Sequence, residues 1–451
     1  MEETNKSHDL IYTLNEKPPV RDSIFAALQH LLAIFVGIIT PTLVIGGILG
    51  LGKEIPYLIS MSLIVSGVAT FIQIKRIGPI GSGLLSIQGT SFAFLGAIIG
   101  AGFLVKNAGG GPKEMLGVIF GMCFFGAFIE MILSRFLHHL KKVITPTVTG
   151  IVVSLIGLSL IKVGLTDMAG GQWLLDNKPE QFGNLENLGL AFLVLITIVF
   201  FNRSRNQFLR MSSIVIGLII GYIVSLFLGR IDLSGLIDLP IISIPIPFKY
   251  GIGFRWEAFV PIALVYLITT IESIGDLTAT SMVSKEPIRG DLYIKRIKGG
   301  VLGDGFNSAM AAIFNTFPNT TFSQNNGVIQ LTGVASRYVG MYIAGFLVLL
   351  GLFPVIGGVF QQMPKPVLGG ATIIMFGTVA AAGIKIISSQ KIDRRAMMII
   401  AISFSMGLGV QLVPQVLNHF PETLKNIFSS PITTGGLTAI VTNLVIPDRS
   451  K

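Results

Sequence analysis

Long apolar stretches alternate with short polar connections along most of the chain. A hydrocarbon layer about 30 Å thick requires roughly 20 apolar residues for each helical crossing, and stretches of this kind recur throughout. The pattern predicts an all-α polytopic membrane protein with fourteen transmembrane segments. The predicted segments are 23–50, 55–74, 84–105, 114–134, 144–164, 186–202, 211–229, 256–284, 297–316, 322–335, 337–360, 365–385, 395–413 and 430–447.

The third and tenth of these segments are short and interrupted by Gly, Ser, Thr, Asn or Pro. They overlap the stretches GSGLLSIQGTSFAF (81–94) and PNTTFSQNNGVIQL (318–331), which place Gln88 and Gln324 at the two breaks. Non-helical backbone at membrane depth is tolerated where it is buried in protein or lines a polar cavity. We therefore expect each segment to form a short strand and a half-helix, and the pair to face a ligand.

An internal repeat relates two halves of similar length. TPTVTGIVVSLIGLSLIKVG in the first half resembles PKPVLGGATIIMFGTVAAAGIKII in the second, so that Pro146 answers Pro366 and Gly150 answers Gly370. Each half holds seven segments, and because seven is odd the second half must sit upside down relative to the first. This 7+7 inverted repeat is common in secondary transporters.

Composition and charge agree with a membrane protein, because 51% of the residues are hydrophobic and only 12% are charged. The net charge of +10 would also suit a nucleic-acid partner, but the basic residues gather in alternate loops. That distribution follows the positive-inside rule, so both termini are expected in the cytoplasm and no nucleic acid is expected. The residues concerned are Lys75, Arg76, Arg135, Lys141, Lys142, Arg203, Arg205, Arg210, Lys285, Arg289, Lys295, Arg296, Lys298, Lys391, Arg394 and Arg395.

Other classes of chemistry lack their sequence signals. Cys123 is the single cysteine, which excludes an intrachain disulfide and fits no metal-ligand spacing. No Walker A sequence is present, so nothing indicates ATP as the energy source. The polar first 22 residues have no basic region followed by an apolar run, so we expect no removable signal peptide. We expect no cofactor, no metal and no enzymatic activity.

Four carboxamides, on Gln324, Asn325, Asn326 and Gln330, lie within seven residues of the tenth segment. Such amides often form hydrogen bonds between membrane helices, and for Asn326 and Gln330 this interpretation has about equal weight with ligand binding. Gln324 favours ligand binding more strongly, because it begins the expected half-helix, where backbone N–H groups are free.

Ionisable residues inside the apolar segments are costly unless they are paired or functional. Glu272 and Asp276 are four residues apart and share one helix face. Two carboxylates in a low-dielectric cavity repel each other, so one of them is expected to take up a proton, which suits proton coupling. Because an enzyme could use the same pair as a general acid and base, recovery of a labelled substrate in unchanged form from cells is the test that separates the two.

Three further ionisable residues admit simpler interpretations. Glu130 lies five residues before Arg135, and we expect these two to pair at the cytoplasmic edge. Asp304 is interpreted as a residue that caps or braces the ninth segment, and His30 as either a packing or a functional residue. Near the two breaks, Phe92 and Phe322 would be placed to sandwich a planar ring.

These motifs resemble the nucleobase-ascorbate transporters, also called the nucleobase:cation symporter-2 family, over essentially the whole chain. The family signature is matched by Gln324, Asn325, Gly327, Thr332 and Gly333. Gln29 with His30, the ESIGD stretch from Glu272 to Asp276, and Asp304 are also similar to family landmarks. The wording QNNGVIQLTGVASRYVG is most similar to the bacterial xanthine permease branch.

The resemblance implies a homodimer whose core domain moves substrate past a gate domain in an elevator-like motion. It implies an N-terminal tail (1–22), core parts at 23–142 and 256–362, and gate parts at 143–255 and 363–451. It also implies that a purine base binds Glu272, Gln324 and the backbone near Phe92 and Ser323. The implied substrate-binding residues are Glu272, Gln324, Phe92, Ser91, Ser323, Asn325 and Phe322, and the implied proton-coupling residues are Asp276, His30 and Asp304.

Departures from the family pattern refine the substrate. Gln324 stands where uracil carriers of the family usually have glutamate, which favours a purine. Ser91 stands where xanthine-selective members typically have asparagine, and its smaller side chain leaves room for the extra oxygen of uric acid. We therefore expect a carrier of xanthine and uric acid. The alternatives are uracil or another nucleobase and, less favoured, an anion transporter of the same architecture, which would need a basic residue near one of the breaks.

Overall fold

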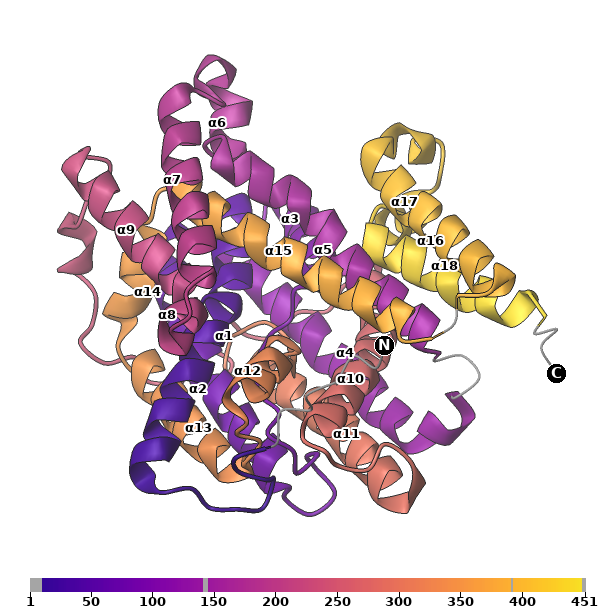
Figure 1. Ribbon diagram of the computed structural model, residues 1–451. Helices are drawn as coiled ribbons and strands as arrows, with labels where there is room; N and C mark the ends of the chain where they lie inside the picture. The colour runs from indigo at the N-terminus through magenta and orange to yellow at the C-terminus, as the bar shows by residue number, and fades with distance from the viewer. Residues whose placement is uncertain (1–9, 141–144, 391, 448–451) are drawn as a thin grey trace.

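The computed structural model describes residues 10–140, 145–390 and 392–447, and these residues form mostly helices (Figure 1). The tail expected at 1–22 is thus described from residue 10 onward. The longer helices are α1 (Val20–Leu49), α2 (Ile55–Lys75), α4 (Pro112–Leu140), α5 (Pro146–Met168), α7 (Leu185–Asn202), α10 (Trp256–Val283), α11 (Gly290–Ile313), α15 (Lys365–Ser388) and α16 (Arg394–Leu412).

Shorter elements connect and interrupt these helices. They are α3 (Leu95–Asn107), α6 (Gln172–Asn177), α8 (Gln207–Met211), α9 (Ser213–Phe227), α12 (Gln324–Thr332), α13 (Arg337–Gly351), α14 (Pro354–Gln361), α17 (Glu422–Phe428), α18 (Pro431–Val445), the strands β1 (Gln88–Thr90) and β2 (Asn319–Thr321), and 3-10 turns at Gly52–Glu54, Pro179–Gln181, Ser234–Leu236 and Pro414–Leu417.

Eight helices among the described residues are long and apolar enough to cross a membrane, or nine if α13 and α14, bent by 74°, count as one span. Each of the fourteen predicted segments nevertheless overlaps a helix. The third also includes β1, and the tenth begins directly after β2. The helix α11 falls outside the eight, because its first two turns carry Lys295, Arg296 and Lys298 and its remainder is rich in small residues.

The two predicted breaks meet in the middle of the molecule. The strands β1 and β2 pair antiparallel, with Gln88 opposite Thr321 and Thr90 opposite Asn319. All six strand residues are buried. The pairing satisfies backbone groups that no helix serves, which is the condition for irregular backbone inside a membrane protein. The expectation of a short strand plus a half-helix at each break is confirmed.

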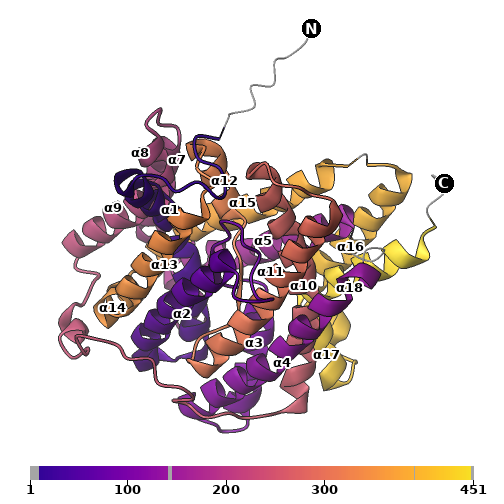
Figure 2. The ribbon, with the colours of Figure 1, turned by 90° about the horizontal axis from the view of Figure 1, so that it is seen from below.

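The segments that resemble each other in sequence, α5 and α15, run side by side (Figure 1). Their contact is close because it is lined by glycine: a Cβ added at Gly157 would lie 2.3 Å from the backbone nitrogen of Ala380. Thr145 caps α5 by accepting a hydrogen bond from the Val148 N–H, and Pro366 lies in the first turn of α15. A second group, α16, α17 and α18, gathers at one end of the molecule in both views (Figures 1 and 2).

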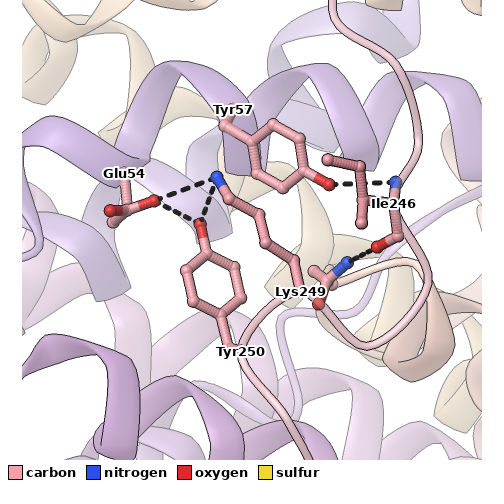
Figure 3. A network of polar contacts seen from close by, with 6 residues as sticks. Glu54, Tyr57, Ile246, Lys249 and Tyr250 are labelled. Carbon is pink, nitrogen blue, oxygen red and sulfur yellow. Dashed lines mark hydrogen bonds and ion pairs between the residues drawn. The ribbon is translucent and has the colours of Figure 1, made fainter.

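The long connection between α9 and α10 is tied to α2 by a polar cluster (Figure 3). The Lys249 ammonium lies 3.4 Å from the Glu54 carboxylate and 3.7 Å from the ring centre of Tyr57. The Tyr250 hydroxyl donates to the same Glu54 carboxylate. Burial, and then this hydrogen bond, raise the pKa of the Tyr250 phenol, so that the phenol remains a donor.

Candidate functional site

Both half-helices begin beside the paired strands. The helix α3 starts at Leu95 and α12 starts at Gln324. Among the described residues, the backbone N–H groups of Phe92, Ala93, Ser323 and Gln324 have no backbone acceptor. A helix N-terminus presents free donors and a partial positive charge, so these groups are available to a carbonyl oxygen or an anion.

The carboxylate of Asp304, on α11, is the centre of the buried polar network. Its Oδ1 accepts hydrogen bonds from Gln73 Nε2 at 2.6 Å and from Gln88 Nε2 at 2.8 Å. Its Oδ2 accepts from the Ser273 hydroxyl at 2.5 Å, and the Thr321 hydroxyl donates at 3.1 Å. Asp304 thus binds α11 to α2, α10 and both strands, which goes beyond the predicted cap or brace of one segment.

His30 and Asn325 contact each other across α1 and α12. The His30 Nδ1 forms a short hydrogen bond with Asn325 Oδ1, while the Asn325 amide donates to the Leu85 carbonyl at 3.1 Å. Both side chains are buried, and His30 Nε2 has no partner. The oxygen and the nitrogen of the Asn325 carboxamide each form one hydrogen bond, so this side chain ties α12 to α1 and to the segment before β1.

One face of α10 carries Glu272, Asp276 and Thr280 at intervals of four residues. The Thr280 hydroxyl donates to Asn326 Oδ1 at 2.8 Å, which ties this face to the first turn of α12. Glu272, two helical turns before Thr280, and Gln324, two residues before Asn326, thus belong to packed elements. The interpretation of Asn326 as a contact between helices is confirmed, and Gln330 is exposed.

The side chains of Glu272 and Gln324 differ from their neighbours in forming no hydrogen bond with any residue that the structure describes. Glu272 Oε2 is buried without a hydrogen bond. Among the described residues no hydrogen bond is formed by the Gln324 carboxamide, which is half-buried. Because nearly all buried polar atoms in proteins are hydrogen-bonded, an unpartnered carboxylate oxygen on α10 and a free carboxamide on the packed helix α12 indicate a place for a polar ligand.

Near the two breaks, the aromatic side chains form packing contacts, whereas one serine hydroxyl has no hydrogen-bond partner among the described residues. The Phe322 ring covers Gly89 and Gly37, since a Cβ added at Gly89 would lie 2.4 Å from Phe322 Cζ. The Phe92 ring meets the Phe376 ring of α15 edge to face, with centroids 5.6 Å apart. The Ser91 hydroxyl is buried and has no partner. Phe92 therefore contacts α15, whereas Phe322 packs between α1 and β1.

Glu130 is not the surface residue that the sequence suggested. Its side chain is 1% exposed and lies 3.5 Å from the Ser273 hydroxyl, the group that also donates to Asp304. Arg135 is exposed and forms no ion pair with it. The spacing of five residues misled the prediction, because Glu130 points to the α10 and α11 side of α4 and Arg135 points away.

Gln73, Ser273 and Thr321 also belong to the network, although the sequence analysis did not single them out. Gln73 carried a usable signal, because it is a lone carboxamide in the otherwise apolar stretch of α2. Ser273 and Thr321 carried none, since serine and threonine are common in membrane helices.

Two cavities, of about 320 Å³ between α1, α9 and α14 and about 90 Å³ between α1, α5 and α15, lie away from Glu272 and Gln324. Within the described residues, no group of three or more His, Cys, Asp or Glu could hold a metal ion.

Comparison with known proteins gives close relatives over the full chain. Xanthine permease XanP of Escherichia coli (strain K12) is 50% identical over 448 residues, which cover 99% of this chain and 96% of XanP. Xanthine permease XanQ of the same organism is 48% identical, with 97% and 94% covered. Nucleobase transporter PlUacP of Paenibacillus larvae is 35% identical, with 92% and 93% covered.

Solved structures share the fold at low sequence identity. The transmembrane domain of the cyanobacterial bicarbonate transporter BicA aligns with a TM-score of 0.55 at 16% identity, covering 96% of this chain and 99% of that domain. The murine anion transporter Slc26a9 in its inward-facing state aligns with a TM-score of 0.64 at 12% identity, covering 96% and 69%. The shared fold is that of multi-pass membrane transporters.

A family model described as the permease family matches residues 21–416. This match includes both breaks, the α10 face and Asp304. With the full-length relatives, it shows that the chain is a multi-pass membrane protein of the permease family, in the nucleobase:cation symporter-2 group and its bacterial xanthine permease branch.

Proposed function

We propose that this protein is a proton-coupled symporter that imports xanthine, and also uric acid, across the cytoplasmic membrane. The observation that carries the proposal is the pair of unpartnered polar groups, the Glu272 carboxylate and the Gln324 carboxamide, on packed helices beside two half-helix N-termini. An oxidised purine has alternating N–H donors and carbonyl acceptors around a flat ring. A carboxylate, a carboxamide and free backbone donors together complement that edge.

In this mechanism Glu272 accepts hydrogen bonds from ring N–H groups, and Gln324 offers one donor and one acceptor. The backbone N–H groups of Phe92 and Ser323 bind carbonyl oxygens, and Phe92 contacts the ring face. Asp276, His30 and Asp304 carry or organise the coupled proton, so that the core domain moves only when its charge is balanced. The names of XanP, XanQ and PlUacP support this substrate class.

The proposed architecture has fourteen spans in a 7+7 inverted repeat, with both termini in the cytoplasm. Core parts at 23–142 and 256–362 would slide as one body along gate parts at 143–255 and 363–451, in a homodimer. The sequence similarity of α5 and α15, and their contact across glycine, support the pairing of the two halves. The structural neighbours support the fold, and the short helices at both breaks support the inclusion of segments too short to span alone.

An anion transporter is the second candidate, because BicA and Slc26a9 share the fold. Half-helix N-termini attract anions as well as carbonyl oxygens. The residues between 86 and 95 and between 317 and 332 contain no Lys or Arg, while Glu272 adds negative charge to the neighbouring helix. The local chemistry therefore favours a neutral base with N–H groups over an inorganic anion.

The deciding experiment is uptake of radiolabelled xanthine, urate, uracil and guanine in a transport-null strain, with and without a protonophore. We expect xanthine and urate to accumulate and the protonophore to stop accumulation. A large excess of unlabelled urate should inhibit xanthine import; if it does not, the dual substrate range is wrong. Bicarbonate uptake without purine uptake would support the anion transporter instead. Recovery of the label in its original chemical form distinguishes transport from enzymatic conversion.

A matched pair of variants tests the role of the carboxylate. Glu272→Gln should abolish xanthine uptake while the protein remains in the membrane, because Glu272 Oε2 has no protein partner to lose. Glu257→Gln makes the same change at an exposed position of α10 and should leave uptake within about twofold of wild type. Near-normal transport by Glu272→Gln would refute the proposed site.

A further inference from the structure

The segment just before α1 is extended and pairs with the chain that follows α12. We call residues 11–16 the N-terminal strap. The Ile11 N–H donates to the Gly333 carbonyl at 2.7 Å, and the Ala335 N–H donates to the Tyr12 carbonyl at 2.9 Å. The Arg337 N–H donates to the Leu14 carbonyl at 3.0 Å, and Tyr12 and Val334 form a parallel bridge.

The strap alternates in burial as a strand does, and one of its side chains is fully enclosed. Leu14 is 1% exposed, while Ile11, three residues earlier, is 67% exposed. Leu14 belongs to a separate apolar cluster whose other buried members are Leu84, Leu137, Leu277, Ile297 and Val301. Truncation of an enclosed leucine leaves a cavity, so the packing of the surfaces around it depends on this side chain.

The members of this cluster lie next to residues of the candidate site. Leu277 follows Asp276 on α10, and Val301 lies one turn before Asp304 on α11. Leu84 precedes the strand that begins at Gln88. Through Leu14 the strap contacts α10, α11 and the stretch before β1. Through its backbone it also holds the end of α12, whose first residue is Gln324.

The end of α12 needs such a support. The helix has nine residues and ends at Gly333, whose φ of 67° is in the left-handed region that glycine adopts at low cost. The Gly333 N–H still closes the α12 ladder onto the Ile329 carbonyl, whereas the Gly333 carbonyl and the N–H groups of Ala335 and Arg337 bond to the strap. The first turn of α12 is held by the contacts of Asn325 and Asn326, and the strap holds its other end, so the strap limits the tilt of the helix that carries Gln324.

We propose that Leu14 is a positioning residue for base binding: the N-terminal strap, locked by Leu14, sets the place of α12 and hence of Gln324 relative to α10. Leu14 does not touch the base. The strap travels with the core domain through the transport cycle, because its partners are on α10, α11 and the segment between α12 and α13. The inference rests on the proposed function, since its readout is the KM for xanthine.

The first test compares two truncations of equal chemistry. Leu14→Ala should raise the KM for xanthine about tenfold while the maximal rate per membrane-inserted protein falls less than about threefold. Ile11→Ala, on the exposed side of the same strap, should keep both values near those of wild type. Equal KM values for the two variants would overturn the inference. Absence of xanthine uptake by the wild type would instead contradict the proposed function.

The second test returns the strap to its place in the same molecule, so a folding defect cannot imitate the result. Tyr12→Cys and Val334→Cys replace the two bridged residues, and the one native cysteine, Cys123, is buried. When these two cysteines are added to Leu14→Ala, oxidation should lower the KM for xanthine to the wild-type value, and reduction should raise it again. A disulfide that forms but leaves the KM raised, or that stops transport by arresting the cycle, would overturn the proposal.

Discussion

Two polar clusters of this protein hold a carboxylate in opposite ways. Glu54, near the surface, faces the Lys249 ammonium, and both side chains are 33% exposed (Figure 3). Asp304 is fully buried and is surrounded by the neutral donors Gln73, Gln88 and Ser273, with no cation among its described partners. A partly exposed ion pair is screened by water and salt, whereas a buried carboxylate must be satisfied by oriented dipoles.

The difference indicates what each cluster is for. The exposed pair ties a loop to α2, and it can be lost at small cost. The buried network holds an acid whose described partners are all neutral, so the charge of this cluster would change whenever a proton arrived or left. A cation next to Asp304 would fix that charge and remove its sensitivity to protons. Four predictions, in order of expected effect, test this comparison.

The largest effect is expected from Asp304→Asn. The change preserves shape but turns one acceptor oxygen into a donor facing the donors of Gln73, Gln88 or Ser273. Each unsatisfied buried group costs about 1–3 kcal/mol, so we expect loss of uptake together with reduced thermal stability in detergent. A stable, active variant would show that the network does not depend on the carboxylate.

Glu272→Gln should abolish transport as completely as Asp304→Asn, but it should reduce thermal stability less. Within the part of the chain that the structure describes, Glu272 Oε2 has no hydrogen bond that the substitution could break. The free energy of unfolding of the Glu272→Gln variant in detergent should therefore match that of wild type within about 1 kcal/mol. Equal destabilisation by both substitutions would mean that Glu272 is structural, contrary to the proposed role.

An intermediate effect is expected for Ser273→Ala, which removes the donor shared by Asp304 and Glu130. Loss of one hydrogen bond to a charged group costs about 1.5–3 kcal/mol, and uptake should fall about three- to tenfold. Ser281→Ala is the control, because Ser281 is also buried on α10 but donates only to the Leu277 carbonyl. Similar losses of uptake in the two variants would show that the hydrogen bond from Ser273 to Asp304 has no specific role in transport.

The smallest effect is expected at the surface. Lys249→Met removes the ion pair with Glu54 and the contact with the Tyr57 ring, which together contribute about 1 kcal/mol or less at this exposure. Uptake should stay within about twofold of wild type, and the small difference in melting temperature should shrink at high salt. A large, salt-independent loss would show that the two clusters are alike.

The sequence predicted the buried network only in part. The breaks at Gln88 and Gln324 were found because Gly, Ser and Asn are conspicuous in apolar segments, and the strand with a half-helix followed from the requirement to satisfy backbone groups. Glu130 was misplaced, because distance along a helix does not say which neighbour packs on which face. The role of Asn325, which bonds His30 and the Leu85 carbonyl, also depends on contacts between distant segments.

The sequence by itself determined the membrane environment, the class of fold and the two interrupted segments. These follow from the length of hydrophobic stretches and from local backbone chemistry, which are properties of short stretches of chain. The tertiary structure alone decided which polar atoms are satisfied and which remain free. Asp304 is enclosed by donors from α2, α10 and both strands, while Glu272 Oε2 has none. That distinction arises from packing between residues far apart in the chain, and no local pattern encodes it.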